Sequence, residues 1–173
     1  MLLESDLVCD ADAVQGAIRR MAGEITRALG QRNPVVLVVM HGGIFLAGQI
    51  LPLLDFPLSV DYVHVTRYGD ATTGGALRWK AEPSESVRDR TVLVLDDILD
   101  VGSTLVAVRD RLLAAGAESV YCAVLTEKET GALKPLRPDF AGLKLPNRYV
   151  FGCGMDVAGA WRNLPAIRAL RGA

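Results

Sequence analysis

The chain has 173 residues, of which 50% are hydrophobic and 23% are charged, and this balance predicts one folded domain over 1–173 and excludes a disordered chain. Its 19 basic and 20 acidic residues give a formal charge of −1, which excludes the basic excess typical of general nucleic-acid-binding proteins. Three widely spaced cysteines form no CxxC pair, and no apolar run approaches the roughly 20 residues of a membrane helix. We therefore expect a cytoplasmic protein with reduced thiols, no membrane contact and no nucleic-acid partner.

Helix-like and strand-like segments alternate along the chain. Apolar residues recur at helical spacing between 14 and 29, which predicts a first helix capped by Asp10 or Asp12 and ended by Asn33-Pro34. A run of apolar residues at 35–40 predicts a buried strand. The next expected elements are a helix at 44–54, a strand at 60–66, a glycine-rich mobile loop at 68–76, a returning strand at 77–80 and a strand at 91–95. They are followed by a helix at 104–115, a strand at 119–125, a mostly irregular segment at 134–147, a short strand at 149–152 and a helical turn at 164–170.

Strands that alternate with helices favour right-handed βαβ units. We therefore expect an α/β fold with a mainly parallel sheet flanked by helices. In such folds ligands bind beyond the carboxyl ends of the strands. The functional residues are expected in the segments that directly follow the strands.

The segment Val92–Leu105, VLVLDDILDVGSTL, carries the most specific pattern. A buried strand runs into the adjacent acids Asp96 and Asp97, a third acid follows at Asp100, and residues 101–104 open a helix with a glycine and two hydroxyls. Such a helix start can surround a phosphate with hydrogen-bond donors, and two neighbouring carboxylates can accept hydrogen bonds from a ribose diol. We expect the third acid to reach a base attached to that sugar. The segment has neither the lysine of a Walker A loop nor the GxGxxG turn of dinucleotide folds.

This segment resembles the diphosphoribosyl-binding motif of the type I phosphoribosyltransferases, and the matches from Val35 to about Leu164 are most similar to the hypoxanthine-guanine members of that family. The resemblance implies the family's mainly parallel α/β fold, with a flexible hairpin lid and a small hood. It implies that Asp96 and Asp97 bind the ribose hydroxyls. It also implies that Asp100 is the catalytic residue, acting as proton donor or acceptor near the purine N7. The implied residues for the 5-phosphate are Val101, Gly102, Ser103, Thr104 and Leu105.

Two further segments resemble the pyrophosphate loop and the lid of the family. The sequence MHGG at 40–43 follows the first strand. The resemblance implies a non-proline cis peptide before the glycine pair and pyrophosphate binding by His41 and Gly42. His41 stands where relatives often have lysine, and a histidine need not be charged at neutral pH. Arg67 and Tyr68 open the glycine-rich loop and are implied to belong to a lid that excludes water.

Other matches concern the purine base. Lys128 has the spacing to Pro138 at which the family's lysine donates to the purine 6-oxo group. A lysine donor there favours a carbonyl over the amino group of adenine. Tyr149 is implied to stack on the purine, and Val150 is implied to present backbone groups to its pyrimidine edge. The resemblance places Ile98 at the same base.

The last match covers the sequences GCGMD and WRNL, which contain Asp156 and Arg162. The resemblance implies that Asp156 holds a magnesium shell and the N2/N3 side of the base. Arg162 is implied to pair with pyrophosphate through its planar guanidinium. Mg²⁺ is the expected cofactor, held by Asp96, Asp97 and Asp156 together with waters and substrate oxygens.

The resemblance therefore implies a purine salvage enzyme. It would join hypoxanthine or guanine to 5-phosphoribosyl diphosphate, give IMP or GMP and pyrophosphate, and work as a homodimer or homotetramer. Two alternatives stay open from the residues. One is a phosphoribosyltransferase that prefers xanthine, because xanthine also carries the 6-oxo group. The other is a nucleic-acid-binding regulator that responds to phosphoribosyl diphosphate, which the acid at Asp100 and the neutral overall charge disfavour.

Overall fold

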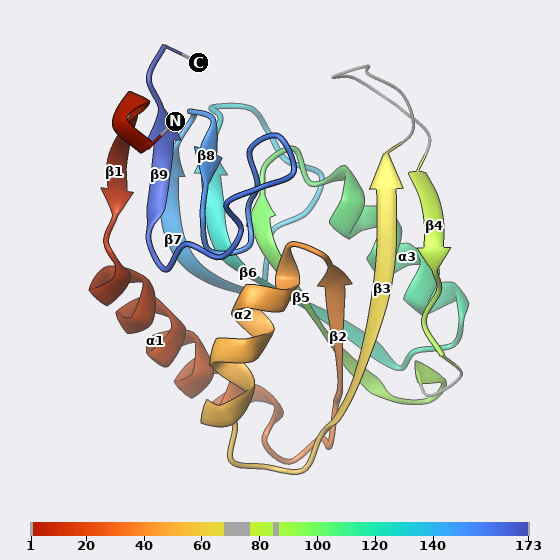
Figure 1. Ribbon diagram of the computed structural model, residues 1–173. Helices are drawn as coiled ribbons and strands as arrows, with labels where there is room; N and C mark the ends of the chain where they lie inside the picture. Colours follow the sequence, from red (N-terminus) through yellow and green to blue (C-terminus); the bar gives the residue numbers. More distant parts are fainter. Residues whose placement is uncertain (1, 68–76, 85–86, 173) are drawn as a thin grey trace.

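The structure, a computed structural model, describes residues 2–67, 77–84 and 87–172. Its largest element is a six-stranded sheet in the order β4-β3-β2-β5-β6-β7 (Figure 1). The strands are β2 Val35–Met40, β3 Ser59–Arg67, β4 Leu77–Ala81, β5 Thr91–Leu99, β6 Ser119–Glu129 and β7 Phe140–Pro146. All neighbours pair in parallel except β3 and β4, which form the expected antiparallel hairpin. The mainly parallel α/β fold is thereby confirmed.

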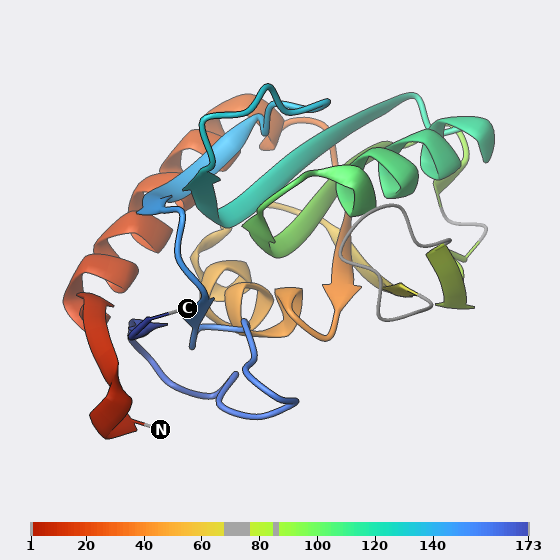
Figure 2. The same ribbon diagram turned by 90° about the horizontal axis from the view of Figure 1, so that it is seen from above.

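Helices cover both faces of this sheet. α1 (Ala11–Leu29) and α2 (Gly43–Ile50) pack on one face, and α3 (Ser103–Ala114) packs on the other (Figure 2). Alternate residues of β2 enter different cores, because successive side chains of a strand point to opposite faces. Val36 and Val38 pack with α1 and α2, whereas Val35 and Leu37 pack with α3. Burial on both faces explains why this strand is an uninterrupted apolar run.

The helices begin and end close to the expected positions. Asp10 caps α1, because its side chain accepts a hydrogen bond from the Ala13 N–H at 2.8 Å. The helix ends at Leu29, before the Asn33-Pro34 stop. The helix expected at 44–54 consists of α2 and a short 3-10 turn, Leu51–Leu53.

A second, smaller sheet contains both ends of the chain. It has the order β1-β9-β8 and is antiparallel, with strands β1 Ser5–Cys9, β8 Val150–Phe151 and β9 Ile167–Leu170. A 3-10 turn, Leu2–Glu4, precedes β1. We call this sheet, together with the segment 152–166 that joins β8 to β9, the hood. The hood lies over the carboxyl ends of the central strands (Figure 1).

Two sequence-based expectations about these elements are wrong, and one strand was missed. The segment 134–147 is not mostly irregular, because it contains β7. Its proline Pro146 is the last residue of an edge strand, a position at which proline is tolerated. The segment 164–170 is not a helical turn but contains β9, in which Ile167 and Ala169 are buried in strand-like alternation. The strand β1 was not expected at all.

Candidate active site

The expected site residues that the structure describes gather at the carboxyl ends of the central strands. β5 extends past the expected end and carries Asp96 and Asp97 inside the strand, with Asp100 directly after it. Lys128 lies near the end of β6, next to β5 in the sheet. Tyr149 lies directly before β8 of the hood. The fold therefore brings residues from three separate segments to one place.

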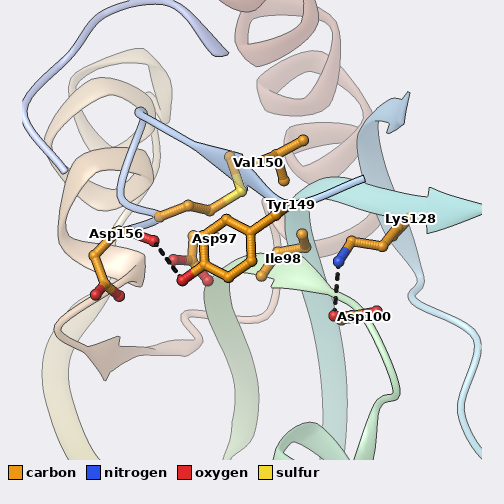
Figure 3. Close-up of a pocket in the computed structure, with 8 residues that line it drawn as sticks. Asp97, Ile98, Asp100, Lys128, Tyr149, Val150 and Asp156 are labelled. Carbon is orange, nitrogen blue, oxygen red and sulfur yellow. Dashed lines mark hydrogen bonds and ion pairs between the residues drawn. The ribbon is translucent and has the colours of Figure 1, made fainter. Parts of the chain in front are cut away.

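The first pocket has a volume of about 230 Å³ and lies between β5, β6 and the hood (Figure 3). Its lining contains all five residues expected at the purine base, Ile98, Lys128, Tyr149, Val150 and Asp156, together with Asp97, Asp100 and Met155. The Lys128 Nζ donates to Asp100 Oδ2 at 2.8 Å. The lysine side chain is 12% exposed and the Asp100 side chain is 45% exposed, so the carboxylate faces the opening. Met155 was missed, because a methionine in a glycine-rich stretch gives no chemical signal.

A second pocket of about 180 Å³ is lined by residues 96–102, Thr104 and Leu105. Gly102 adopts a left-handed conformation (φ +91°) directly before α3, which a residue with a side chain rarely adopts. The expected phosphate-binding residues Val101, Gly102, Thr104 and Leu105 line this pocket, and Ser103 is the first residue of α3. Asp97, Ile98 and Asp100 line both pockets. A ligand in one pocket is therefore separated from a ligand in the other only by this shared wall.

The acid pair between the pockets is buried at an electrostatic cost. Asp96 is 7% exposed and Asp97 is 8% exposed. Burial, and then the charge of Asp97, raise the pKa of Asp96 well above its ordinary value. Burial also raises the pKa of Asp97, although Asp96 and the Arg162 charge counteract it. The Asp97 N–H donates to Asp96 Oδ1 at 2.9 Å, which fixes the first carboxylate.

We expect Asp96→Asn to stabilise the free protein. The native pKa of Asp96 is raised above the unfolded pKa, so this carboxyl destabilises the fold at neutral pH. The cost falls as the pH drops from the native toward the unfolded pKa, and it is gone below the unfolded pKa. An asparagine can still accept from the Asp97 N–H without ionising. The expected gain at pH 7 is about 2–6 °C in the midpoint of thermal unfolding, measured by circular dichroism in metal-free buffer. The gain shrinks toward pH 4, whereas an equal or lower midpoint at pH 7 contradicts the electrostatic account.

Asp61→Asn is the control of opposite sign. Burial favours the neutral form of Asp61, but hydrogen bonds from Ser84 and from the Tyr62 N–H outweigh it and lower the pKa of this carboxyl. Its ionised form therefore stabilises the fold above the unfolded pKa, and the substitution lowers the midpoint at pH 7.

The loop after β2 approaches the acid pair closely. The Met40–His41 peptide is cis, which confirms the expectation from the sequence. A Cβ atom on Gly42 would lie 2.2 Å from Asp97 Oδ2, so only glycine allows this approach. Gly154 of the hood packs just as closely against Gly42, because a Cβ atom on Gly154 would lie 2.2 Å from the Gly42 carbonyl oxygen. The β2 loop, β5 and the hood therefore meet at one carboxylate.

His41 has an aromatic partner that the sequence analysis missed. The rings of His41 and His64 of β3 meet edge to face, with centroids 4.5 Å apart. Burial, then the charges of His41 and Lys80, lower the pKa of His64. The contact joins the loop after β2 to β3 and has no local sequence signature.

Arg162 and Asp156 form an ion pair in the hood. Arg162 Nη2 lies 2.6 Å from Asp156 Oδ1, and Nη1 donates to the Gly154 carbonyl at 2.6 Å. The same guanidinium lies 3.9 Å from Asp97 Oδ2. Arg162 therefore brings positive charge to the acid pair and to the hood turn beside Gly42.

The carboxylates fit a magnesium ion that takes few protein ligands. Within the described ranges, no cluster of three or more His, Cys, Asp or Glu side chains forms a metal cage. Asp96 and Asp97 nevertheless present adjacent carboxylates whose repulsion a divalent cation would relieve. The Asp156 carboxylate already has two partners, because it pairs with Arg162 and accepts a hydrogen bond from the Gly159 N–H. Mg²⁺ suits such a donor set, because it keeps several waters and substrate oxygens as ligands.

The expected lid is not placed by the structure. Arg67 is the last residue of β3, and its side chain and Tyr68 lie outside the described residues.

Among the helices of the described ranges, none is both long and apolar enough to cross a lipid bilayer.

Comparisons with known sequences point to one family. The family model for the phosphoribosyl transferase domain matches residues 8–158. The hypoxanthine-guanine-xanthine phosphoribosyltransferase of Tritrichomonas foetus is 32% identical over 161 residues, which cover 92% of this chain and 88% of that protein. The hypoxanthine-guanine phosphoribosyltransferase of Streptococcus pneumoniae is 28% identical over 174 residues, covering 98% and 97%.

Solved structures agree with these sequence matches. A hypoxanthine-guanine-xanthine phosphoribosyltransferase superposes with a TM-score of 0.85 and 29% identity, covering 95% of this chain and 96% of that chain. A hypoxanthine phosphoribosyltransferase from Staphylococcus aureus superposes with a TM-score of 0.91, covering 99% and 94%. The latter is 22% identical and shows the shared fold.

Proposed function

We propose, since the chain belongs to the phosphoribosyl transferase family, that it transfers the 5-phosphoribosyl group from 5-phosphoribosyl diphosphate to hypoxanthine or guanine. The products are IMP or GMP and pyrophosphate, as purine salvage requires. The observation that carries this proposal is the wall of Asp97, Ile98 and Asp100 shared by the two pockets. A ribose at this wall has its 5-phosphate in one pocket and its base in the other.

The residues around the ribose hold the reacting carbon between base and leaving group. Asp96 and Asp97 accept hydrogen bonds from the ribose hydroxyls, and the helix start at 101–105 binds the 5-phosphate. Pyrophosphate leaves toward Gly42, where His41 and Arg162 supply donors. The bond between the anomeric carbon and the pyrophosphate oxygen breaks while the bond to the purine nitrogen forms. Carbocation character develops at that carbon, as in other sugar transfers.

The purine lies in the pocket of Figure 3. Tyr149 stacks on the ring, and Lys128 donates to the 6-oxo group. Asp100 accepts the proton that the base loses near N7. The Lys128–Asp100 contact at 2.8 Å supports this division of roles, since it sets a donor beside an acceptor within one pocket. Ile98 and Val150 complete the walls.

We propose Mg²⁺ as the cofactor, bound by Asp96, Asp97 and Asp156 together with substrate oxygens. When bound, it neutralises the pyrophosphate charge and orients the leaving group. Cys122 and Cys153 take no part, because burial raises the pKa of both to about 12 and keeps these thiols protonated. Free thiols at all three cysteines also support a cytoplasmic location.

A homo-oligomer is the proposed assembly. Val60 and Tyr62 of β3 are exposed apolar side chains on the sheet face that carries α2, and Ile44 of α2 is exposed as well. Exposed apolar groups of this kind favour burial against a second copy. Sedimentation velocity that detects only a monomer at micromolar concentration contradicts this part of the proposal.

Xanthine is a second candidate base. The Tritrichomonas foetus relative is named for xanthine as well as for hypoxanthine and guanine, and all three bases share the 6-oxo group that Lys128 faces.

The reaction is tested by incubating the protein with 5-phosphoribosyl diphosphate, hypoxanthine and MgCl₂. We expect IMP and pyrophosphate in equal amounts by chromatography, and loss of both when EDTA replaces magnesium. Free base that stays unchanged in the complete mixture contradicts the proposed function. Turnover that EDTA leaves intact contradicts only the metal assignment.

A further inference from the structure

Lys134, which lies between β6 and β7, has a side chain that is largely withdrawn from solvent. Its side chain is only 11% exposed. The Nζ atom donates to the Lys128 carbonyl oxygen at 2.5 Å and to the Leu99 carbonyl oxygen at 3.2 Å, and it lies 3.4 Å from Glu127 Oε1. Its three acceptors match the three N–H donors of an ammonium.

The two carbonyl groups stand directly beside the proposed purine-binding residues. Leu99 precedes Asp100 in the chain, and the other carbonyl belongs to Lys128 itself. The parallel ladder between β5 and β6 has its last pair at Leu99 and Glu127. Beyond that pair no ladder bond between these two strands fixes the distance from Asp100 to Lys128. The Lys134 ammonium bridges the two strands at this point.

Lys134 does not itself line the pocket for the base or the pocket for the phosphate. It lines a neighbouring concavity, which it shares with Lys128. Lys134 therefore acts on a bound base indirectly, through the backbone that carries Asp100 and Lys128.

Withdrawing most of a lysine side chain from water has a free-energy cost, because the charge loses part of its hydration and needs compensating partners. An apolar side chain would pack the loop at lower cost, as the buried Leu136 does two residues later. What an apolar side chain cannot provide is a charge-assisted hydrogen bond to two carbonyls at once. The chemistry of this lysine thus matches a requirement for fixed geometry at the strand ends.

We propose that Lys134 is a positioning residue that fixes the separation of Asp100 and Lys128, and thereby the geometry of the purine-binding pocket. This inference rests on the proposed function. Loss of the Lys134 ammonium removes the bridge between the Leu99 and Lys128 carbonyls, although the Thr130 N–H still donates to the Lys128 carbonyl at 3.2 Å, and lets the strand ends move apart. The phosphate-binding helix start depends less on this bridge, because Leu105 and Val108 anchor α3 in the core on the other face of the sheet.

The test compares Lys134→Met with the matched control Lys144→Met. Lys144 lines the same concavity, but its side chain is 71% exposed and lies 4.0 Å from Glu129. For Lys134→Met we expect the KM for hypoxanthine to rise about tenfold or more, because small displacements in a site are costly. The KM for 5-phosphoribosyl diphosphate changes less than about threefold on the same argument. Lys144→Met keeps both values, and Lys134→Arg, which retains charged donors, recovers part of the affinity for the base.

A double-mutant cycle with Lys128→Ala separates positioning from a general loss of stability. If Lys134 acts through its neighbours, Lys134→Met adds little to the KM for hypoxanthine once Lys128 is removed, so the two effects are not additive. Additive effects, or equal effects on both substrates, overturn the inference. Should Lys134→Met fail to fold, Lys134→Gln, which keeps an N–H donor on a shorter side chain, is judged by the same criteria.

The wild-type control distinguishes the two possible failures. Wild-type protein that forms no nucleotide from any base overturns the proposed function, and the inference with it. Wild-type protein that is active, beside a Lys134→Met variant that behaves like Lys144→Met, overturns the inference alone.

Discussion

Asp100→Asn is expected to lower kcat roughly 10²–10⁴-fold, which is the usual contribution of a positioned general acid or base. Asparagine has nearly the same shape but cannot take up the proton that the purine loses near N7. The KM for 5-phosphoribosyl diphosphate is expected to change little, because the ribose and phosphate contacts lie on the acid pair and on the helix start at 101–105. Steady-state kinetics with each substrate varied in turn measures both constants.

Asp110→Asn is the matched control for this substitution. Asp110 lies on α3, is exposed, and pairs with Arg109 at 2.8 Å outside both pockets. We expect wild-type kinetics for it. An Asp100→Asn variant with unchanged kcat removes Asp100 from its proposed role, and one with an equally large rise in both KM values points to a binding role.

Lys128→Ala is expected to raise the KM for hypoxanthine about 10- to 100-fold. A hydrogen bond to a charged group is worth about 1.5–3 kcal/mol, and each 1.36 kcal/mol corresponds to a factor of ten. We expect the loss of affinity for the base alone, because Lys128 lines the base pocket and not the phosphate pocket. The affinity for 5-phosphoribosyl diphosphate is expected to stay within about threefold by the same energy scale.

Lys144→Ala controls for the loss of one positive charge near this edge of the sheet. If Lys128→Ala leaves the affinity for hypoxanthine unchanged, the assignment of this lysine to the 6-oxo group is wrong. Weakened binding of both substrates to the same degree indicates a damaged fold, which circular dichroism detects.

The sequence is most informative where one strand carries both burial and chemistry. β2 and β5 are apolar runs buried on both faces, and such runs followed by acids or glycines locate the site at strand ends. The acid pair, Asp100 and the glycine at 102 could be assigned to one pocket region from 14 consecutive residues, Val92–Leu105. Local patterns are sufficient here because these groups come from one strand and the turn after it.

The hood is poorly predicted because its stability comes from long-range pairing. Ser5 pairs with Leu170, and Val150 pairs with Ala169, so β1 and β9 have no recognisable local signal, whereas the short strand expected at 149–152 is confirmed by β8. Its strands have two to five residues, too few for a clear period. Proline misled the prediction at β7, since edge strands tolerate it.

Side chains that support the site are equally hidden from sequence patterns. Lys134 meets Leu99 across 35 residues, and His64 meets His41 from a neighbouring strand. Neither lies in a motif, and a lysine in a polar loop normally indicates an exposed surface. Only the register of the sheet reveals what these side chains contact.

Product formation measured separately for each base tests the central claim most directly. The protein is incubated with 5-phosphoribosyl diphosphate, MgCl₂ and one of hypoxanthine, guanine, xanthine, adenine or uracil, and nucleotides are separated by chromatography. We predict nucleotide from hypoxanthine and guanine and none from adenine or uracil. Nucleotide from xanthine would show that xanthine is a substrate as well. Nucleotide from adenine or uracil at a comparable rate contradicts the 6-oxopurine site, and no nucleotide from any base contradicts catalysis itself.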